Sequence, residues 1–372
     1  MTLEQWQVAL RREFGRDQPF RLKNVGSEPV FSEFEVRNPR SGRAYRVVIR
    51  GRGPGDNFCA CPDYAVNTLG TCKHIEFTLA KLARMRGGQQ ALESGYRPPH
   101  AEVFLRYGPR REVVYRHARD GSPGLAPLVT RYFDRGGVLR PEAYARFDRF
   151  LREAAGRDGS LRCYEDALAY IAQVRDRDQL ARRVDAAFPP GAGRGALAGL
   201  VKTRLYPYQQ EGARFVARAG RSLLADDMGL GKTVQAIATV EILARTAGVE
   251  RVLVVTPTSV KFQWKQEIER FTERPAHVIE GLLARRAAQY RNGGFYKITN
   301  YEVVHRDLEA IRAWRPDVVI LDEAQRIKNW NTRRARTIKQ LQSEYAIVLT
   351  GTPLENRLEE LHSIVEFVDR FR

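Results

Sequence analysis

Short apolar segments alternate with amphipathic helical segments through the second half of this chain. Val252–Val255 and Val318–Leu321 consist of Val, Ile and Leu and lack the polar alternation of a half-exposed strand. Such runs are typical of parallel strands covered by helices on both faces, because parallel strands are usually joined by helices. We therefore expect an α/β domain over residues 196–372. Its expected strands are Ser222–Ala225, Arg251–Thr256, Tyr296–Thr299, Asp317–Leu321 and Ala346–Thr350.

A glycine-rich segment, residues 223–233, follows the first expected strand and precedes a helical pattern. Backbone N–H groups at the start of a helix bind phosphate well. In a phosphate loop, Lys232 would contact the β- and γ-phosphate oxygens of ATP, and the Thr233 hydroxyl would bind Mg²⁺. The strict pattern has Gly where this chain has Asp226, so the segment needs independent support. The expected ATP-binding residues of the loop are Gly229, Gly231, Lys232 and Thr233.

Two adjacent carboxylates supply that support, because they directly follow the buried run 318–321. Asp322 is placed to hold Mg²⁺ through water, and Glu323 is placed to orient or deprotonate the attacking water. Alone, the pair could equally cap a following helix. Combined with the phosphate loop, it predicts an ATP-hydrolysis site whose catalytic residues are Lys232, Asp322 and Glu323.

A cluster of cysteines and a histidine lies in the first hundred residues. Cys59-Ala-Cys61 and Cys72-Lys-His74 provide four ligands, the number that tetrahedral zinc takes. With four protein ligands no position remains for a catalytic water, so we expect a structural zinc site. The alternative is a set of buried cysteines with an incidental histidine. Basic residues near the cluster favour DNA as a partner, or form a solubilising rim: Arg46, Arg50, Arg52 and Lys73.

The first half of the chain divides by pattern into a small α+β zinc module and a basic, mainly helical linker domain. In the linker, Ser160 is expected to cap a helix over residues 161–174. Clustered Pro and Gly in residues 188–195 predict a hinge. The expected domains are therefore residues 1–95, 96–195 and 196–372.

The charge balance indicates a polyanionic partner. The chain has 62 Lys and Arg against 44 Asp and Glu, a formal net charge of +18, which is typical of nucleic-acid binding or of an arginine-rich solvated surface. A hydrophobic content of 43% excludes a mostly disordered chain. No apolar run approaches the about 18 residues of a membrane span, and the N-terminus lacks the apolar block of a secretory signal. We expect no membrane partner and a cytoplasmic, nucleoid-associated or nuclear location without secretion.

Five blocks in residues 204–372 occur in an order that resembles the N-terminal lobe of Swi/Snf-like ATPases, helicase-superfamily-two motors that translocate on double-stranded DNA. The resemblance implies a RecA-like parallel sheet with helices on both faces. It also implies that Asp226 belongs to the form of the phosphate loop that this family has, and that Gln209 contacts the adenine of ATP. The blocks are Tyr206–Gly212, Asp226–Thr233, Thr256–Trp264, Asp322–Gln325 and Leu349–Asn356.

The third block resembles the one that touches the DNA backbone, and the fifth resembles the one that couples nucleotide state to lobe movement. Lys261 and Lys265 are candidate DNA contacts, or else exposed helix residues. In the N-terminal module, the one-residue gap within both ligand pairs resembles the SWIM zinc finger, which is associated with DNA or protein binding. That resemblance covers about 30 residues and matches all four ligands.

The family builds its ATP site between two lobes, and arginines of the second lobe stabilise the transition state. Residues 1–372 carry the blocks of the first lobe only. We therefore expect this chain alone to bind ATP and hydrolyse it very slowly, with a second RecA-like lobe supplied in trans as one route to activity. The alternative is a non-enzymatic, zinc-stabilised DNA- or protein-binding scaffold with an ATP-sensing lobe. A third interpretation is a P-loop transporter or small kinase. It is weaker because it gives no role to Gln209 or to Thr350–Thr352.

Overall fold

The computed structural model describes residues 2–157, 160–189, 197, 199–227, 229–324, 333–351 and 367–369. It forms two compact units, Met1–Arg175 and Asp176–Arg372, which divide within a long helix, α7 (Glu165–Ala187). Among the described residues, no helix combines the length and the apolar character needed to cross a membrane.

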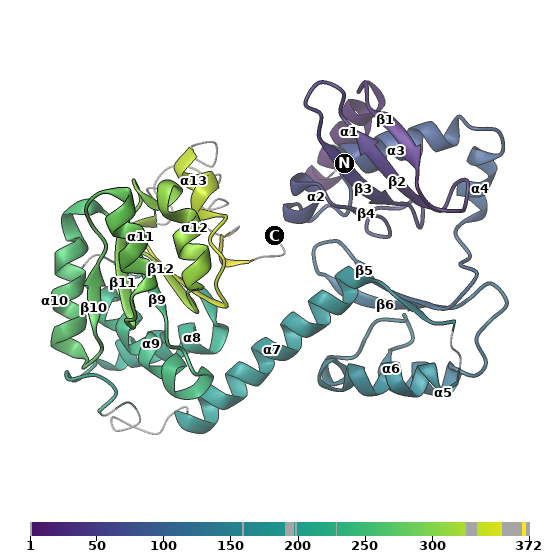
Figure 1. Ribbon diagram of the computed structural model, residues 1–372. Helices are drawn as coiled ribbons and strands as arrows, with labels where there is room; N and C mark the ends of the chain where they lie inside the picture. Colours follow the sequence, from purple (N-terminus) through teal and green to yellow (C-terminus); the bar gives the residue numbers. More distant parts are fainter. Residues whose placement is uncertain are drawn as a thin grey trace. The chain divides into compact units, whose positions relative to one another are not determined.

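The second unit is built on a six-stranded parallel sheet, in the order β10-β11-β9-β12-β13-β8 (Figure 1). This confirms the predicted α/β fold with a parallel sheet. The expected strands are all present within one residue or so at each end, while β10 was not predicted because its three residues carry too short a pattern. The strands are β8 (Arg221–Leu224), β9 (Val252–Thr256), β10 (Ala276–Val278), β11 (Tyr296–Asn300), β12 (Val318–Leu321) and β13 (Tyr345–Leu349).

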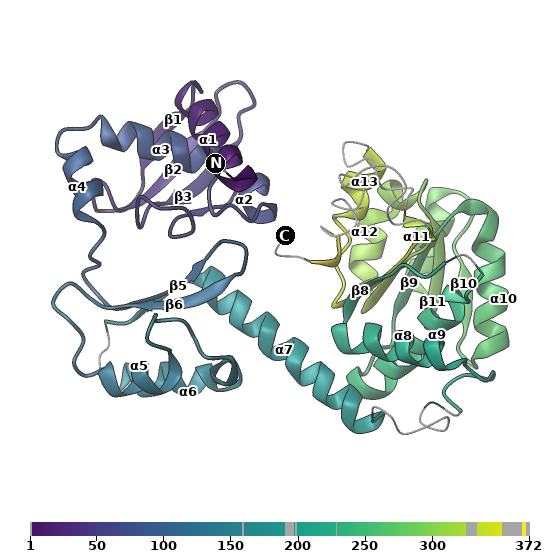
Figure 2. The same cartoon turned by 180° about the vertical axis from the view of Figure 1, so that it is seen from behind.

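Helices cover both faces of this sheet (Figures 1 and 2). Successive strand residues point to opposite faces, so Val254 and Ile320 pack with α8, α9 and α10, whereas Val255 and Leu321 pack with α11, α12 and α13. The unbroken apolar runs thus reflect two separate cores. The helices are α8 (Pro207–Ala219), α9 (Lys232–Ala247), α10 (Lys261–Phe271), α11 (Leu283–Arg291), α12 (Val304–Trp314) and α13 (Arg333–Ile338), with a 3-10 turn, η3 (Thr258–Val260).

The first unit begins with an antiparallel sheet in the order β1-β2-β3-β4. Phe34, Val36 and Val47 of this sheet pack against Ile75 and Phe77 of helix α3. The elements are α1 (Leu3–Arg16), β1 (Arg21–Asn24), β2 (Glu33–Arg37), β3 (Ala44–Val48), β4 (Phe58–Cys59), α2 (Pro62–Val66), α3 (Lys73–Ala83) and α4 (Gly88–Ser94).

A second, three-stranded sheet, β6-β5-β7, follows in the same unit. The helix expected over residues 161–174 is wrong at its start, because Arg162–Cys163 forms β7 and α7 begins at Glu165. The N–H groups of Arg162 and Tyr164 donate to the edge of β5 instead, a non-local pairing that local helix patterns do not reveal. The elements are β5 (Glu102–Arg106), β6 (Glu112–Arg116), α5 (Ala126–Tyr132), η1 (Pro141–Arg146), α6 (Phe147–Ala155), β7 (Arg162–Cys163) and α7.

Candidate functional site

The carboxyl ends of the parallel strands meet at one edge of the six-stranded sheet, and the predicted ATP-site residues follow these ends. The phosphate loop follows β8 and the acid pair follows β12. Strand β13 lies between β8 and β12, and the N–H of Thr350, just after β13, donates to the Leu224 carbonyl at 3.2 Å. Segments distant in sequence are thereby brought to the same edge of the sheet.

The phosphate loop closes around the Lys232 side chain. Its ammonium donates to the carbonyls of Asp226 at 2.9 Å and Asp227 at 3.0 Å. Gly229 and Gly231 have φ angles of +86° and +73°, a left-handed backbone that glycine adopts without the steric cost of a side chain. Helix α9 begins immediately at Lys232 with Thr233 as its second residue, so its first N–H groups point at the loop, as phosphate binding requires.

Gln209 is buried at the start of α8 and contacts the phosphate loop. Its side-chain amide donates to the Leu230 carbonyl at 3.2 Å and accepts the Tyr206 N–H at 3.0 Å. The neighbouring rings of Tyr206 and Tyr208 are exposed and stacked, with centroids 5.9 Å apart. Sequence reasoning missed this aromatic pair, although two tyrosines on either side of a proline beside Gln209 were a signal.

Asp322 is held by Thr256 and Trp264, the two ends of the third block, in a contact that the sequence did not predict, and by Tyr301, which the sequence did not single out. Its Oδ2 atom accepts hydrogen bonds from the Trp264 indole at 2.8 Å and from the Thr256 hydroxyl at 2.9 Å. The Tyr301 hydroxyl donates to the Asp322 backbone carbonyl at 2.7 Å. Burial raises the pKa of Asp322 above its usual range, and the Trp264 and Thr256 hydrogen bonds oppose that rise.

Glu323 has a φ of +52°, which non-glycine residues seldom adopt. The chain therefore turns sharply directly after Asp322, at the position predicted to activate water. Three further predictions fall outside the described residues, namely most of the hinge expected over residues 188–195, Gln325, and the part of the fifth block after Gly351.

Residues 208–370 match the model of the SNF2-related domain. We call this matched part of the chain the SNF2-related domain, after the family model that it resembles. Over 180 residues it is 37% identical to a Bacillus subtilis protein provisionally named ATP-dependent helicase/translocase YwqA, a match that covers 45% of this chain and 19% of that protein. Over 282 residues it is 31% identical to the DNA excision repair protein ERCC-6-like of Bos taurus, covering 64% of this chain and 22% of that protein. The chain thus spans about a fifth of the length of these relatives.

Among solved structures, the SWI2/SNF2 ATPase core of Sulfolobus solfataricus in complex with double-stranded DNA shares 32% sequence identity with this chain. The match covers 45% of this chain and 36% of that one, with a TM-score of 0.42.

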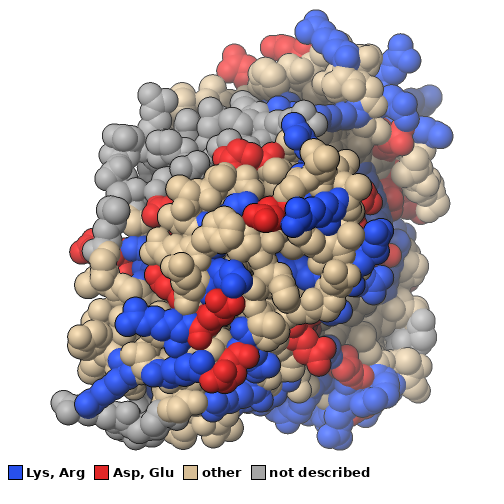
Figure 3. All heavy atoms as spheres, turned by 60° about the vertical axis from the view of Figure 1, so that its left-hand side comes forward, with Lys and Arg blue, Asp and Glu red and all other residues tan. Residues whose placement is uncertain are grey.

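The candidate DNA-contacting lysines of the SNF2-related domain are both engaged in other contacts. Lys261 is buried, and its ammonium lies 3.4 Å from the Ile279 carbonyl, so the alternative of an exposed helix residue is wrong there. Lys265 forms an ion pair with Glu269, one helical turn away, at 2.8 Å. Over the face shown in Figure 3, Lys and Arg side chains lie among Asp and Glu rather than in one continuous basic patch.

N-terminal to the SNF2-related domain, the structure brings together the four predicted zinc ligands. One ligand atom from each of Cys59, Cys61, Cys72 and His74 lies within 4.8 Å of the others, and all four residues are buried. The Cys59 and Cys72 sulfurs lie 3.9 and 4.0 Å from His74 Nδ1. Buried thiols and an imidazole converging at such distances fit the donor set of tetrahedral zinc.

Hydrogen bonds and ring packing within and around the cluster act on Cys61 and His74. Hydrogen bonds from Cys59 and then Cys72 lower the pKa of Cys61, whereas burial raises the pKa of Cys59 and of Cys72. The Tyr64 N–H also donates to the Cys61 sulfur at 3.4 Å. The His74 ring is flanked by Phe20 and Tyr45, whose centroids lie 5.0 and 4.8 Å away, and this packing fixes the imidazole orientation.

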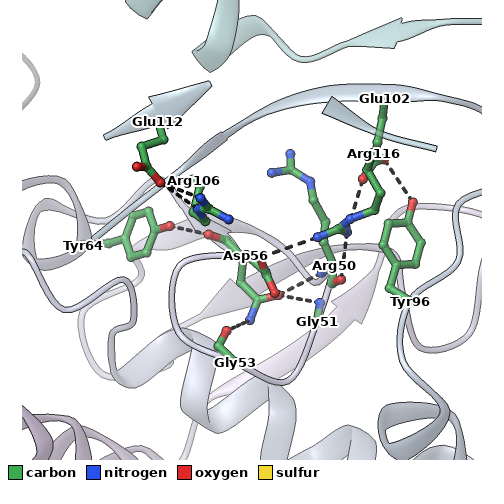
Figure 4. A network of polar contacts seen from close by, with 11 residues as sticks. Arg50, Gly51, Gly53, Asp56, Tyr64, Tyr96, Glu102, Arg106, Glu112 and Arg116 are labelled. Carbon is green, nitrogen blue, oxygen red and sulfur yellow. Dashed lines mark hydrogen bonds and ion pairs between the residues drawn. The ribbon is translucent and has the colours of Figure 1, made fainter. Parts of the chain in front are cut away.

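Arg50 is not part of an exposed basic rim, contrary to expectation. It is 2% exposed, and its guanidinium lies 3.7 Å from the Tyr164 ring centroid and 5.4 Å from that of Phe104. Figure 4 shows that the Arg50 backbone takes part in a polar network, in which Arg116 donates to the Arg50 carbonyl, while no dashed line reaches the Arg50 guanidinium. Arg46 pairs with Glu33 at 2.9 Å. Both contacts connect side chains from separate segments, which charge counting along the sequence does not reveal.

Proposed function

We propose that the SNF2-related domain is the first ATP-binding lobe of a motor that translocates on double-stranded DNA. The observation that carries the proposal is that the parallel sheet brings the Lys232 loop and the Asp322–Glu323 pair to the same edge. When bound there, ATP with Mg²⁺ would supply the phosphoryl group for hydrolysis. The proposed ATP-binding residues are Gln209, Gly229, Gly231, Lys232 and Thr233, with Thr233 and Asp322 on Mg²⁺.

Each side chain has a proposed role that its position supports. Lys232 would exchange its two carbonyl acceptors in the loop for phosphate oxygens, which compete well because they are charged. Asp322 keeps Oδ1 for a Mg²⁺-bound water, since Oδ2 accepts the hydrogen bonds from Thr256 and Trp264. Glu323, turned away from the strand direction by its positive φ, would orient the attacking water.

DNA binding and location belong to the proposal as well. A net charge of +18 supports a polyanionic partner, and the relatives' names include a helicase/translocase and an excision repair protein. We propose nuclear or nucleoid location on the same basis. We also propose that residues 1–95 are a SWIM-type module with structural zinc on Cys59, Cys61, Cys72 and His74, which contacts DNA or a protein partner, and that residues 96–195 link it to the motor lobe.

Nucleotide binding and hydrolysis test the ATP site directly. The 372-residue chain should bind a fluorescent ATP analogue, and Lys232→Ala should weaken that binding at least about tenfold because a charge-assisted contact to phosphate is lost. Lys202→Ala, which removes a surface ion pair with Glu273, is the matched control. Absence of nucleotide binding by the unmodified chain would refute the proposed site.

Turnover with and without double-stranded DNA tests the motor. We propose very slow hydrolysis by the 372-residue chain, because transition-state arginines come from a second lobe in this family's site. Adding a second RecA-like lobe in trans should then raise turnover, and Glu323→Gln should abolish the increase. Fast DNA-stimulated turnover by the 372-residue chain, abolished by Glu323→Gln, would refute slow hydrolysis and establish an arginine from another source. Nucleotide binding without turnover under every condition would favour the ATP-sensing scaffold.

A further inference from the structure

Arg50 is a buried arginine with unpaired N–H groups. The residue is 2% exposed, and its Nε and Nη1 atoms are buried without a hydrogen-bond partner among the described residues. A guanidinium keeps its proton inside proteins, so deprotonation cannot relieve the cost of burying this charge. Because buried polar groups are nearly always hydrogen-bonded and buried charges are nearly always paired, the two nitrogens point to a partner of opposite charge.

The aromatic rings next to this guanidinium do not supply that charge. Its carbon atom lies 3.7 Å from the Tyr164 ring centroid and 5.4 Å from that of Phe104. Such rings attract a cation through their π electrons, but they accept no ordinary hydrogen bond from its N–H groups. The Tyr164 hydroxyl donates to Glu102 at 3.2 Å, and burial raises the pKa of Tyr164, which keeps the hydroxyl neutral.

The nearest acids of the polar network pair with a different arginine (Figure 4). Glu102 and Asp56 lie 3.3 and 3.5 Å from the Arg116 guanidinium. Arg116 also donates to the Arg50 backbone carbonyl at 3.2 Å. No carboxylate in the described part of the chain forms an ion pair with Arg50 itself, so the network does not provide the missing partner either.

We infer that the Arg50 guanidinium binds a small free oxyanion, such as inorganic phosphate or a carboxylate, where the two sheets of the first unit meet. Guanidinium N–H groups form strong, charge-assisted hydrogen bonds with phosphate and carboxylate oxygens. Because the residue is enclosed, the site suits a small anion rather than the phosphate backbone of DNA. Arg50 follows β3, whereas Phe104 lies on β5 and Tyr164 follows β7. A bound oxyanion would therefore strengthen the contact between the two sheets.

Phosphate binding to the full chain tests this inference directly. In equilibrium dialysis with labelled inorganic phosphate, Arg50→Met should bind about one phosphate fewer per chain than the unmodified chain, because methionine fills similar space without charged donors. Phosphate on the Lys232 loop is the same in both chains and cancels in the comparison. Arg149→Met, which removes an exposed arginine that pairs with Glu153, is the matched control and should lose none. Acetate should displace the Arg50-dependent phosphate, whereas chloride at equal ionic strength should displace much less.

Thermal melting gives a second, independent measurement. A ligand that binds only the folded state raises the melting temperature by mass action, so phosphate should raise that of the unmodified chain by at least about 2 °C more than that of Arg50→Met. Phosphate also stabilises folded proteins in general, but this effect acts on both chains and is removed by the comparison. Arg50→Lys keeps the charge without the planar set of donors and should bind phosphate at least about tenfold more weakly.

The outcomes separate this inference from the proposed function. Equal phosphate counts and equal melting shifts in the unmodified chain and Arg50→Met would overturn the oxyanion site, as would displacement by chloride as effective as displacement by acetate. Should Arg50→Met fail to fold, Arg50→Lys decides, and unchanged phosphate affinity in that variant would overturn the site. Arg50→Met should bind the fluorescent ATP analogue as the unmodified chain does, so a failure at either site leaves the other proposal in place.

Discussion

Lys297 on β11 places an ammonium group in the interior of the SNF2-related domain. The residue is 0% exposed, and its ammonium donates to the carbonyls of Gln289 at 2.9 Å and Asn292 at 2.7 Å near the end of α11. It also lies 4.4 Å from the centroid of the Trp314 ring. A cation is favourable at the C-terminus of a helix, yet burial lowers the pKa of Lys297 to about 8.

This pKa predicts how the stability of the domain depends on pH. In the unfolded chain a lysine keeps its proton up to about pH 10.4, whereas folded Lys297 loses it near pH 8. Between these values the unfolded state binds more protons, so this group makes the free energy of unfolding rise with pH, by at most about 1.4 kcal/mol per pH unit. Urea unfolding across that interval should give a free energy of unfolding that rises more steeply with pH for the unmodified chain than for Lys297→Met. Parallel pH profiles would contradict the prediction.

Among the elements, two helices begin at the candidate metal centre. Cys61 and Cys72 are the N-cap residues of α2 and α3, and His74 lies in the first turn of α3. Thiolates are favoured at helix N-termini, where the backbone N–H groups carry partial positive charge. A metal bound there would join β4, α2 and α3.

Removing one ligand should therefore destabilise the N-terminal module. We expect Cys72→Ser to lower bound zinc well below one per chain and to cost several kcal/mol of stability, measured by metal analysis and thermal melting. The control is Cys163→Ser, because Cys163 lies outside the cluster and burial raises its pKa to about 12, which disfavours a metal-binding thiolate. Full zinc content in Cys72→Ser would argue against the assignment.

The two sheets of the first unit are joined by a buried ionic network (Figure 4). Glu102 on β5 is 1% exposed and accepts from Arg116 at 3.3 Å. Arg116 also donates to the Arg50 carbonyl at 3.2 Å. The network therefore connects the β5-β6-β7 sheet to the zinc module through the Arg116 side chain and the Arg50 backbone carbonyl.

Breaking this pair should cost more than breaking a surface pair. Arg116→Ala leaves the Glu102 carboxylate buried with tyrosine hydroxyls as its remaining partners, and such a change costs about 3 kcal/mol or more. Arg149→Ala, which removes an exposed ion pair with Glu153, should cost less than about 1 kcal/mol. Denaturant unfolding measures the free energy of unfolding of both variants. Equal decreases in Arg116→Ala and Arg149→Ala would show that the Arg116 network is no stronger than a surface pair.

For the whole molecule, the net charge of +18 leads to a prediction about salt. Binding to double-stranded DNA should be largely independent of sequence and should weaken by at least about tenfold between 50 and 200 mM salt, because counterions are released from the phosphates. Fluorescence anisotropy with two unrelated duplexes measures both properties. Affinity that is insensitive to salt, or strongly different between the duplexes, would contradict backbone-dominated binding.

The sequence alone predicted those parts of the molecule that local patterns encode. Buried strands require uninterrupted Val, Ile and Leu, so the parallel sheet was predictable from runs such as 252–255. The Lys232 loop and the Cys59–His74 cluster were recognisable because phosphate and zinc impose short, fixed spacings on their ligands. Strands of few residues, such as β7 and β10, were missed because too few positions carry a pattern.

The tertiary structure decided which side chains meet. Trp264 and Thr256 contact Asp322 because β9 and β12 are neighbours in the sheet, a relation that no spacing along the chain expresses. Arg50 became a buried partner of Tyr164, and Lys261 a buried partner of Ile279, for the same reason. Residue type and spacing determine what chemistry a segment is able to perform. Burial and non-local contacts determine which partners each polar group finds, because they depend on how separate segments pack together.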